Sequence, residues 1–131
     1  MTESVKKLKA SINSWEDIAA ACGVDPVKCL PYPDPKDSDE ISHNAFKKIT
    51  LTTRLFNGGK GKVDHNNGMQ EKWFPWFIKG PSGFGFDGAN AGYVRTYTFV
   101  GPRLEFLDEE ICEWFCKHPE LSKIYIEFLS E

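Results

Sequence analysis

The chain has 131 residues, of which 40% are hydrophobic, 27% are charged and 14% are aromatic, and its formal net charge is −3. This size and composition fit one globular domain with a real core, and no apolar run reaches the roughly 18 residues of a membrane-spanning helix. We expect a single domain over residues 1–131, with residues 1–13 poorly ordered or peripheral. Because the N-terminus lacks the apolar stretch of a secretory signal, we expect a cytoplasmic protein whose four cysteines are reduced thiols.

The charge is unevenly distributed along the chain. Residues 1–45 hold five Lys and eight Asp or Glu, so their net charge is −3. Residues 46–103 hold nine Lys or Arg and three Asp or Glu, which gives +6, and residues 104–131 hold two Lys and eight Asp or Glu, which gives −6. A basic segment rich in aromatic residues suits an anionic ligand with a flat ring. The alternative is that the basic and acidic segments pair with each other inside the fold.

The first half of the chain is predicted to be helical. Ser14 can cap a helix that begins at Trp15 and continues to Cys22, and Gly23 is placed to end it in a left-handed conformation. Three alternating prolines within residues 30–35 then predict an extended connector. Ser38 is expected to cap a longer helix over Asp39–Asn57, which Gly58 and Gly59 end before a flexible loop to residue 68.

The β part is expected to follow this loop. Lys72–Ile78 reads as a strand in which Pro75 argues for an edge position or a bulge, and Phe84–Phe86 is a short second piece. Gly92–Val100 is the clearest strand, because it is rich in aromatic and β-branched residues, and Arg103–Leu107 makes another.

The C-terminal part is predicted to return to helix. Asp108 caps a helix that continues through Cys116, Pro119 breaks or restarts it, and residues 121–128 carry an apolar face. The order of helices, strands and helix predicts an α+β fold, with a small antiparallel β-sheet packed by N-terminal helices and a C-terminal helix.

The segment 73–88 is the most distinctive part of the sequence. It places two Trp, four Phe, two Pro and four Gly in sixteen residues. Aromatic side chains supply large apolar area, and glycines let another group approach the backbone closely. This composition favours a surface shaped for a ligand or a partner.

Four short blocks of the sequence carry a family resemblance. Lys72–Phe77 is followed by Ser82–Phe86, and Gly101–Phe106 leads into the acidic C-terminal helix, while Trp15–Asp17 precedes an earlier helix. This resembles a group of small proteins of phages and prophages of gut bacteria, in which YPWF, SGxGF and GSRLxF blocks occur in this order. Phe74 stands here where that group favours Tyr, and Pro102 where it favours Ser.

The resemblance implies a phage context and carries over no catalytic residue. Small phage proteins include those that resemble anti-defence sponges, which sequester nucleotide immune signals. Virion components and host-takeover factors fit the same context.

The residues with possible chemistry do not form a known catalytic or metal-binding pattern. Cys112 and Cys116 share one helical face, and buried thiols are expected there and not a zinc site. His65 beside Asp64 has the composition of a general base, but no recognisable nucleophile accompanies the pair. The segment 58–62 is rich in glycine but lacks the ending of a phosphate-binding P-loop. We therefore expect no enzyme activity, no cofactor and no metal.

The leading hypothesis is a non-enzymatic, phage-type binding protein that sequesters a small anionic, ring-bearing ligand such as a nucleotide immune signal. Five aromatic residues are expected to contact the ring, and three cations are expected to contact the charge. These ligand-binding residues are Trp73, Trp76, Phe84, Tyr93 and Tyr97 for the ring, and Lys79, Arg95 and Arg103 for the charge.

Other interpretations of the same residues stay open. Phe84 and Phe86 also fit a core position, and Arg95 and Arg103 also fit ion pairs with the acidic C-terminal helix. The alternative function is a protein-interaction or virion module whose exposed aromatics bind a partner chain. Tryptophans on an edge strand suit a subunit interface, so a homo-oligomer is expected. The overall acidity disfavours nucleic-acid binding, and no membrane association is expected.

Overall fold

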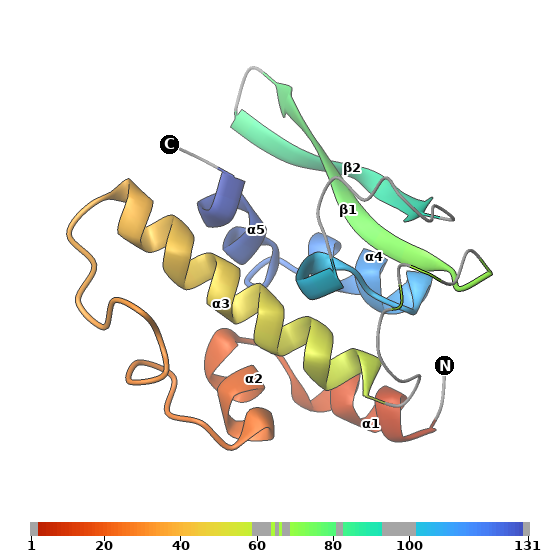
Figure 1. Ribbon diagram of the computed structural model, residues 1–131, viewed down its shortest axis with the longest axis horizontal. Helices are drawn as coiled ribbons and strands as arrows, with labels where there is room; N and C mark the ends of the chain where they lie inside the picture. The colour runs from red at the N-terminus through yellow and green to blue at the C-terminus, as the bar shows by residue number, and fades with distance from the viewer. Residues whose placement is uncertain are drawn as a thin grey trace.

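The computed structural model describes residues 3–58, 64, 66, 69–80, 83–92 and 102–129, with the backbone alone at 76–80, 83–92 and 102 (Figure 1). Most of this part is helical. Its elements are α1 (Glu3–Ser11), α2 (Trp15–Cys22), α3 (Ser38–Asn57), β1 (Lys72–Gly80), β2 (Gly83–Gly92), the short 3₁₀ helix η1 (Pro102–Leu104), α4 (Glu109–Lys117) and α5 (Ser122–Leu129).

The predicted α+β class is wrong, because the described protein is mainly helical. Its β structure is one antiparallel pair of strands, β1 and β2, and not a sheet that helices pack around. The predicted strand over residues 92–100 lies, from residue 93 on, outside the described residues. The predicted strand at Arg103–Leu107 is replaced by η1 and a single bridge between Trp73 and Phe106.

Two side chains of α3 explain why residues 103–107 form no strand. The Thr53 hydroxyl donates to the carbonyl oxygen of Arg103 at 2.8 Å. Asn57 Nδ2 donates to the Glu105 carbonyl at 2.8 Å, and Asn57 Oδ1 accepts from the Leu107 amide at 2.8 Å. These side chains satisfy backbone groups that a neighbouring strand would otherwise satisfy, so the segment needs no ladder.

The caps of α2 are those that the sequence predicted. Ser14 has an extended backbone, and its hydroxyl accepts from the amide of Asp17 at 3.3 Å. Gly23 follows the helix at a φ of 72°, in the left-handed region where glycine is preferred. The start and the end of α2 are therefore confirmed.

The caps of the longer helices are confirmed with one shift. The N-cap of α3 is Asp37 and not Ser38, because the Asp37 carboxylate accepts from the amide of Glu40 at 2.9 Å. Asp108 caps α4 as predicted, and its carboxylate accepts from the amides of Glu110 and Ile111. The helical structure is interrupted at Pro119 and resumes at Ser122.

The core lies around α3, which crosses the middle of the molecule with α1 and α2 on one side and α5 on the other (Figure 1). Phe115 of α4 sits at its centre, with its ring 5.8 Å from that of Phe106 and 5.5 Å from that of Tyr125. The same core contains fully buried apolar side chains from the N-terminal and C-terminal parts of the chain, including Ile12, Ile18, Ile49, Phe106, Ile111 and Leu121.

The hairpin of β1 and β2 contacts α4 through both strands. The pairing shifts by one residue between Trp76 and Phe77, so the irregularity that Pro75 predicted is present as a bulge next to it. The predicted strand at residues 72–78 is confirmed, and the short piece at residues 84–86 is part of the longer β2.

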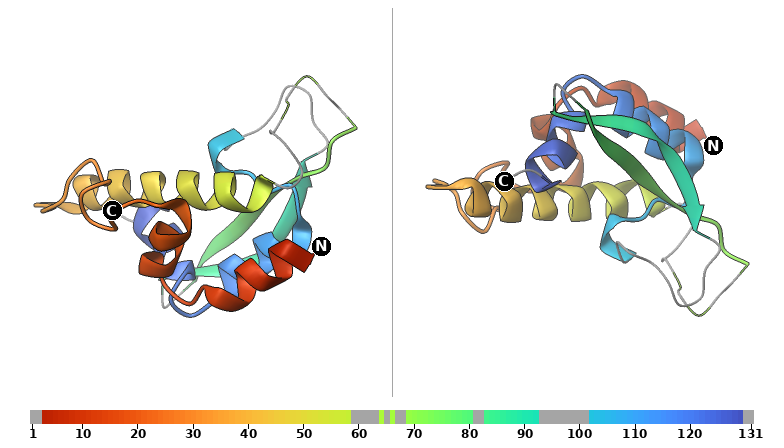
Figure 2. Two further views of the ribbon diagram at one scale, coloured as in Figure 1. Left: turned by 90° about the horizontal axis from the view of Figure 1, so that it is seen from below. Right: turned by 90° about the horizontal axis from the view of Figure 1, so that it is seen from above.

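The N-terminal segment forms a helix at the edge of the fold. No residue of α1 is fully buried, although Val5 and Leu8 pack partly against the core and the following Ile12 is 2% exposed. Both views of Figure 2 place α1 alongside α4. None of the described helices is both long enough and apolar enough to cross a membrane.

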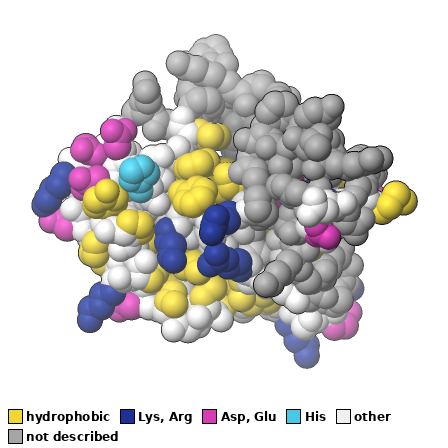
Figure 3. All heavy atoms as spheres, viewed as in Figure 1, with side chains coloured by type: hydrophobic (Ala, Val, Ile, Leu, Met, Phe, Trp, Pro, Cys, Tyr) yellow, Lys and Arg dark blue, Asp and Glu magenta, His cyan; other side chains and the backbone are white. Residues whose placement is uncertain are grey.

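One face of the molecule exposes apolar side chains. Phe46 of α3 is 36% exposed and Leu129 of α5 is 44% exposed, and the Phe46 ring lies 5.7 Å from the ring of Phe128. Figure 3 shows hydrophobic side chains gathered in the middle of this face, with lysine or arginine side chains beside them. We call Phe46, Phe128 and Leu129 the α3–α5 patch.

Candidate ligand groove between α1 and α4

The predicted ligand site is only partly within the described residues. Trp73 is partly buried and packs against the core, and its backbone pairs with Phe106 through two hydrogen bonds of 2.7 Å. Arg103 is exposed. The described part of the structure contains no hydrogen bond, ion pair or ring contact between these two side chains.

The side chains of the other six predicted residues lie outside the described part of the structure. Trp76 and Lys79 belong to β1 and Phe84 to β2, but their side chains lie outside the description. Tyr93, Arg95 and Tyr97 lie outside the described residues altogether. The predicted cluster therefore stays a prediction; of its members, Trp73 packs partly against the core and Arg103 is exposed.

A different concavity lies where α1 meets α4. Two adjoining hollows of about 540 and 570 Å³ share the side chains of Lys9, Glu110 and Trp114. We call the two hollows together the Trp114 groove. The hollow on the α1 side is completed by Lys6, Ala10, Ile12 and Asn13, and the hollow on the α4 side by Glu113, Lys117, His118 and Pro119.

The helical period places these residues on one face of α4. Cys112, Phe115 and Cys116 are buried in the core. Glu110, Trp114 and Lys117 follow at intervals of four and three residues, so they share the opposite, outward side of the helix. The same helix therefore supplies both a core face and a wall of the groove.

Trp114 forms the floor of the groove. Its ring meets that of the buried Phe56 edge-on, with centroids 5.5 Å apart, so the indole is supported from the core side. Lys9 Nζ lies 5.9 Å from the indole centroid, which is within the range of a cation–π contact. None of the described residues accepts a hydrogen bond from the indole Nε1. A half-buried indole with one open side is a suitable surface for a planar ring.

The groove is lined by charged side chains of both signs. Among the described ion pairs, none involves Lys9 or the carboxylates of Glu110 and Glu113. Lys6 pairs with Glu3 at 3.3 Å, but both side chains are exposed, and such pairs contribute little free energy. A ligand would therefore displace no strong interaction from these positions.

His118 closes one end of the groove. Its Nδ1 accepts from the amides of Glu120 at 3.1 Å and Leu121 at 3.3 Å, and its ring meets Trp114 edge-on at 5.9 Å. Because Nδ1 accepts these bonds, the neutral ring carries its proton on Nε2. His118 thereby stabilises the turn between α4 and α5 at this end of the groove.

The cysteines are free thiols with two different environments. Cys112 and Cys116 are buried, as their shared helical face predicted, whereas Cys22 and Cys29 are half-buried. Burial raises the pKa of the Cys116 thiol, and the neighbouring Cys112 raises it further. Burial also raises the pKa of Cys22, with a smaller contribution from Cys29. The raised pKa keeps the Cys22 and Cys116 thiols in the protonated form, which is a poor nucleophile and a poor metal ligand.

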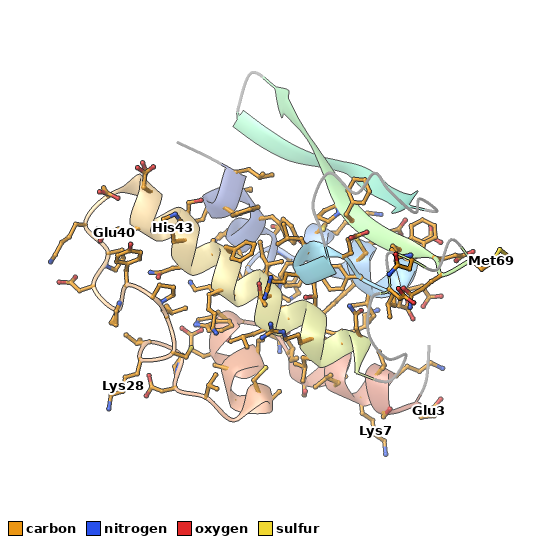
Figure 4. The ribbon with its side chains drawn as sticks, viewed as in Figure 1. Glu3, Lys7, Lys28, Glu40, His43 and Met69 are labelled. Atoms are coloured by element: carbon orange, nitrogen blue, oxygen red, sulfur yellow. The ribbon has the colours of Figure 1, made fainter. Side chains whose placement is uncertain are left out.

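The remaining histidines and acids form no further site in the described part of the chain. His43 stacks on Tyr32 with ring centroids 5.8 Å apart, and Figure 4 shows it on the side of α3 that also carries Glu40. His65 lies outside the described residues. Within the described residues, no three His, Cys, Asp or Glu side chains gather closely enough to hold a metal ion.

No protein-family model matches the chain, and neither the curated proteins nor the solved structures contain a match. The resemblance to small phage proteins therefore stays a prediction, and the Trp114 groove is the feature of the described structure that bears on function.

Proposed function

We propose that the protein is a non-enzymatic binding protein whose ligand is a small anionic molecule with a planar ring, such as a signalling nucleotide. This keeps the ligand class that the sequence predicted and assigns it to the Trp114 groove. The observation that carries the proposal is the Lys9–Trp114 pair, which combines an aromatic surface and a cation at the meeting point of two hollows.

The ring and the charge of such a ligand have separate partners in the groove. A ring that stacks on the indole gains about 1–3 kcal/mol, as bases do on aromatic side chains. Lys9 has a long flexible side chain, so it can leave the indole face and contact an anionic group of the ligand. Lys6 lies one turn earlier on α1 and lines the same hollow, so the anion has two cations within reach.

The size of the groove also fits this ligand class. Each hollow falls within the volume of about 300–1,000 Å³ that is usual for small-molecule sites. We place this function in the cytoplasm, where nucleotides are available. The resemblance to phage proteins makes nucleotide immune signals the first ligands to test, and an anti-defence sponge the role that would follow.

Calorimetric titration with adenosine monophosphate, cyclic mononucleotides, cyclic dinucleotides and cyclic ADP-ribose tests the proposal. At least one of these ligands is expected to bind, and Lys9→Glu is expected to weaken it at least tenfold. Lys7→Glu is the matched control, because it makes the same charge change on α1 and Lys7 points away from the molecule (Figure 4). No binding by any ligand, or equal losses for the two variants, contradicts a specific site at the groove.

The second candidate function is binding of a partner chain, and the α3–α5 patch is the observation that favours it. Its exposed Phe46 and Leu129 resemble the apolar anchors of interfaces more than the surface of an isolated domain. Light scattering coupled to gel filtration measures whether the chain forms a homo-oligomer. If the patch is an interface, Phe46→Ser shifts the mass to that of the monomer, and an unchanged mass rejects this candidate.

A further inference from the structure

The two hollows of the Trp114 groove differ in the charges that line them. The hollow on the α1 side has Lys6 and Lys9, with Glu110 as its one acid. The hollow on the α4 side adds Glu113 and Lys117, so two carboxylates line it. Lys9 and Glu110 line both hollows, so a ligand lying across Trp114 meets two lysines at either end, with one carboxylate at the α1 end and two at the α4 end.

The two carboxylates are free to accept hydrogen bonds from a ligand. The described structure shows no ion pair at Glu110 or Glu113. An ionised carboxylate only accepts hydrogen bonds, so it attracts an N–H edge and repels a carbonyl edge. Glu113 lines only the α4-side hollow, together with Trp114, so its carboxylate is a hydrogen-bond acceptor at the end of the groove away from Lys6.

We infer that the groove selects rings that carry an exocyclic amine, and that its ligands are adenine-type nucleotides in preference to hypoxanthine-type ones. This inference rests on the binding function proposed above. Lys6 and Lys9 take the phosphate, Trp114 takes the ring face, and the Glu113 carboxylate accepts from the amine at the ring edge. Hypoxanthine presents a carbonyl oxygen where adenine presents the amine, so a carboxylate held at that position meets like partial charge, and the one donor left on that edge is the neighbouring N1–H.

Adenosine and inosine monophosphates are the matched pair of probes, because they differ at this one edge and share the phosphate and the ribose. Isothermal titration of both nucleotides against the wild-type protein is expected to give at least tenfold tighter binding of the adenosine form. Glu113→Gln keeps the size of the side chain and adds an amide donor, so it can meet either ring edge. This variant is expected to bring the two affinities within about threefold of each other.

The control is Glu109→Gln, which removes the same charge from an exposed position of α4 that does not line the groove. It is expected to keep the tenfold preference. Thermal unfolding of each variant shows whether the fold is intact. Lys6→Ala tests the phosphate contact separately, and it is expected to weaken the binding of both nucleotides by the same factor.

The possible results separate the preference for adenine-type rings from the proposed binding function on which it rests. Equal binding of the two nucleotides to the wild-type protein overturns the selectivity and leaves the binding function in place. A preference that survives Glu113→Gln overturns the assignment of Glu113. Binding of neither nucleotide overturns the inference, and only a complete absence of binding across the wider nucleotide panel overturns the proposed function as well.

Discussion

Lys9 Nζ lies 5.9 Å from the centre of the Trp114 ring, and this contact joins the first helix of the chain to the fourth. The indole is supported from behind by Phe56, so the contact holds α1 against a rigid surface. The two residues define the place where a ring and an anion can be bound side by side. The proposed function depends on this arrangement, whereas the fold depends on other contacts.

Asn57 is expected to be the most sensitive polar residue of the described core. Asn57 is 7% exposed, and its carboxamide donates a hydrogen bond to the Glu105 carbonyl and accepts one from the Leu107 amide. Asn57→Ala removes both bonds in a buried setting and is expected to lower the free energy of unfolding by about 2–4 kcal/mol. Urea denaturation measures this loss, with the exposed Asn66→Ala as a control that should change stability by less than about 0.5 kcal/mol. Similar midpoints for the two variants would show that the clamp on residues 105–107 is unimportant.

Two glycines at helix ends are expected to respond oppositely to alanine. Gly23 has a φ of 72°, and a methyl group there would meet no atom within 4 Å, so the cost of Gly23→Ala is conformational. We expect a loss of about 1–2 kcal/mol. Gly58 is right-handed, and its added methyl group would lie 3.5 Å from the Leu55 carbonyl, an ordinary contact, so Gly58→Ala should be neutral or stabilise by up to about 1 kcal/mol. Thermal unfolding of both variants checks the prediction, which fails if Gly58→Ala is the more damaging.

The buried hydroxyl of Tyr125 predicts a loss of stability at alkaline pH. Burial, together with Cys116 and Cys112, raises the pKa of Tyr125 well above its ordinary value, and burial raises the pKa of Cys116 as well. The folded protein therefore keeps protons that the unfolded chain releases near pH 9 to 10. The stabilisation is complete below this range and is lost progressively as the pH rises above it toward the raised pKa values of the folded protein, by about 1.4 kcal/mol per pH unit for each group.

Denaturation in urea from pH 7 to pH 11 measures this effect. Tyr125→Phe should be less stable than the wild type at pH 7, by about 1 kcal/mol, because the hydroxyl donates to the Leu104 carbonyl at 3.3 Å. Above pH 10 its stability should fall less steeply than that of the wild type. Parallel pH profiles for the two proteins would contradict a buried, protonated tyrosine.

The four cysteines are expected to react with a maleimide in two groups. Cys22 and Cys29 are half-buried and should be labelled in the native protein, with Cys22 slower because burial raises the pKa of its thiol. Cys112 and Cys116 are buried and should be labelled only after denaturation. Peptide mass spectrometry over time separates the four rates. Labelling of Cys112 as fast as that of Cys29 would place α4 at the surface and contradict the core.

Local chemistry made the helix ends predictable from sequence. Ser14, Gly23 and Asp108 act through atoms within four residues of themselves, so their roles could be read without the fold. The N-cap of α3 was misassigned by one residue, because Asp37 and Ser38 are adjacent and both residue types cap helices well.

Contacts between distant segments were not predictable in the same way. The apolar pattern of residues 103–107 fits a strand, and what prevents one is a set of hydrogen bonds from Thr53 and Asn57, about fifty residues earlier in the chain. The Trp114 groove was missed because residues 1–13 were expected to be poorly ordered or peripheral, and the contact of Lys9 with a helix near the other end of the chain has no signal in the local sequence. The spacing of Glu110, Trp114 and Lys117 on one helical side was the available signal.

The most direct test of the account is nuclear magnetic resonance of the tryptophan indoles during titration with adenosine monophosphate. The Trp114 indole N–H resonance, assigned by its disappearance in Trp114→Phe, is predicted to shift progressively and saturate. The Trp15 indole, whose Nε1 donates to the Pro26 carbonyl at 2.8 Å, is the internal reference and should not move. A Trp114 resonance that stays in place at saturating nucleotide, or that moves no more than that of Trp15, would contradict a ligand site at the groove.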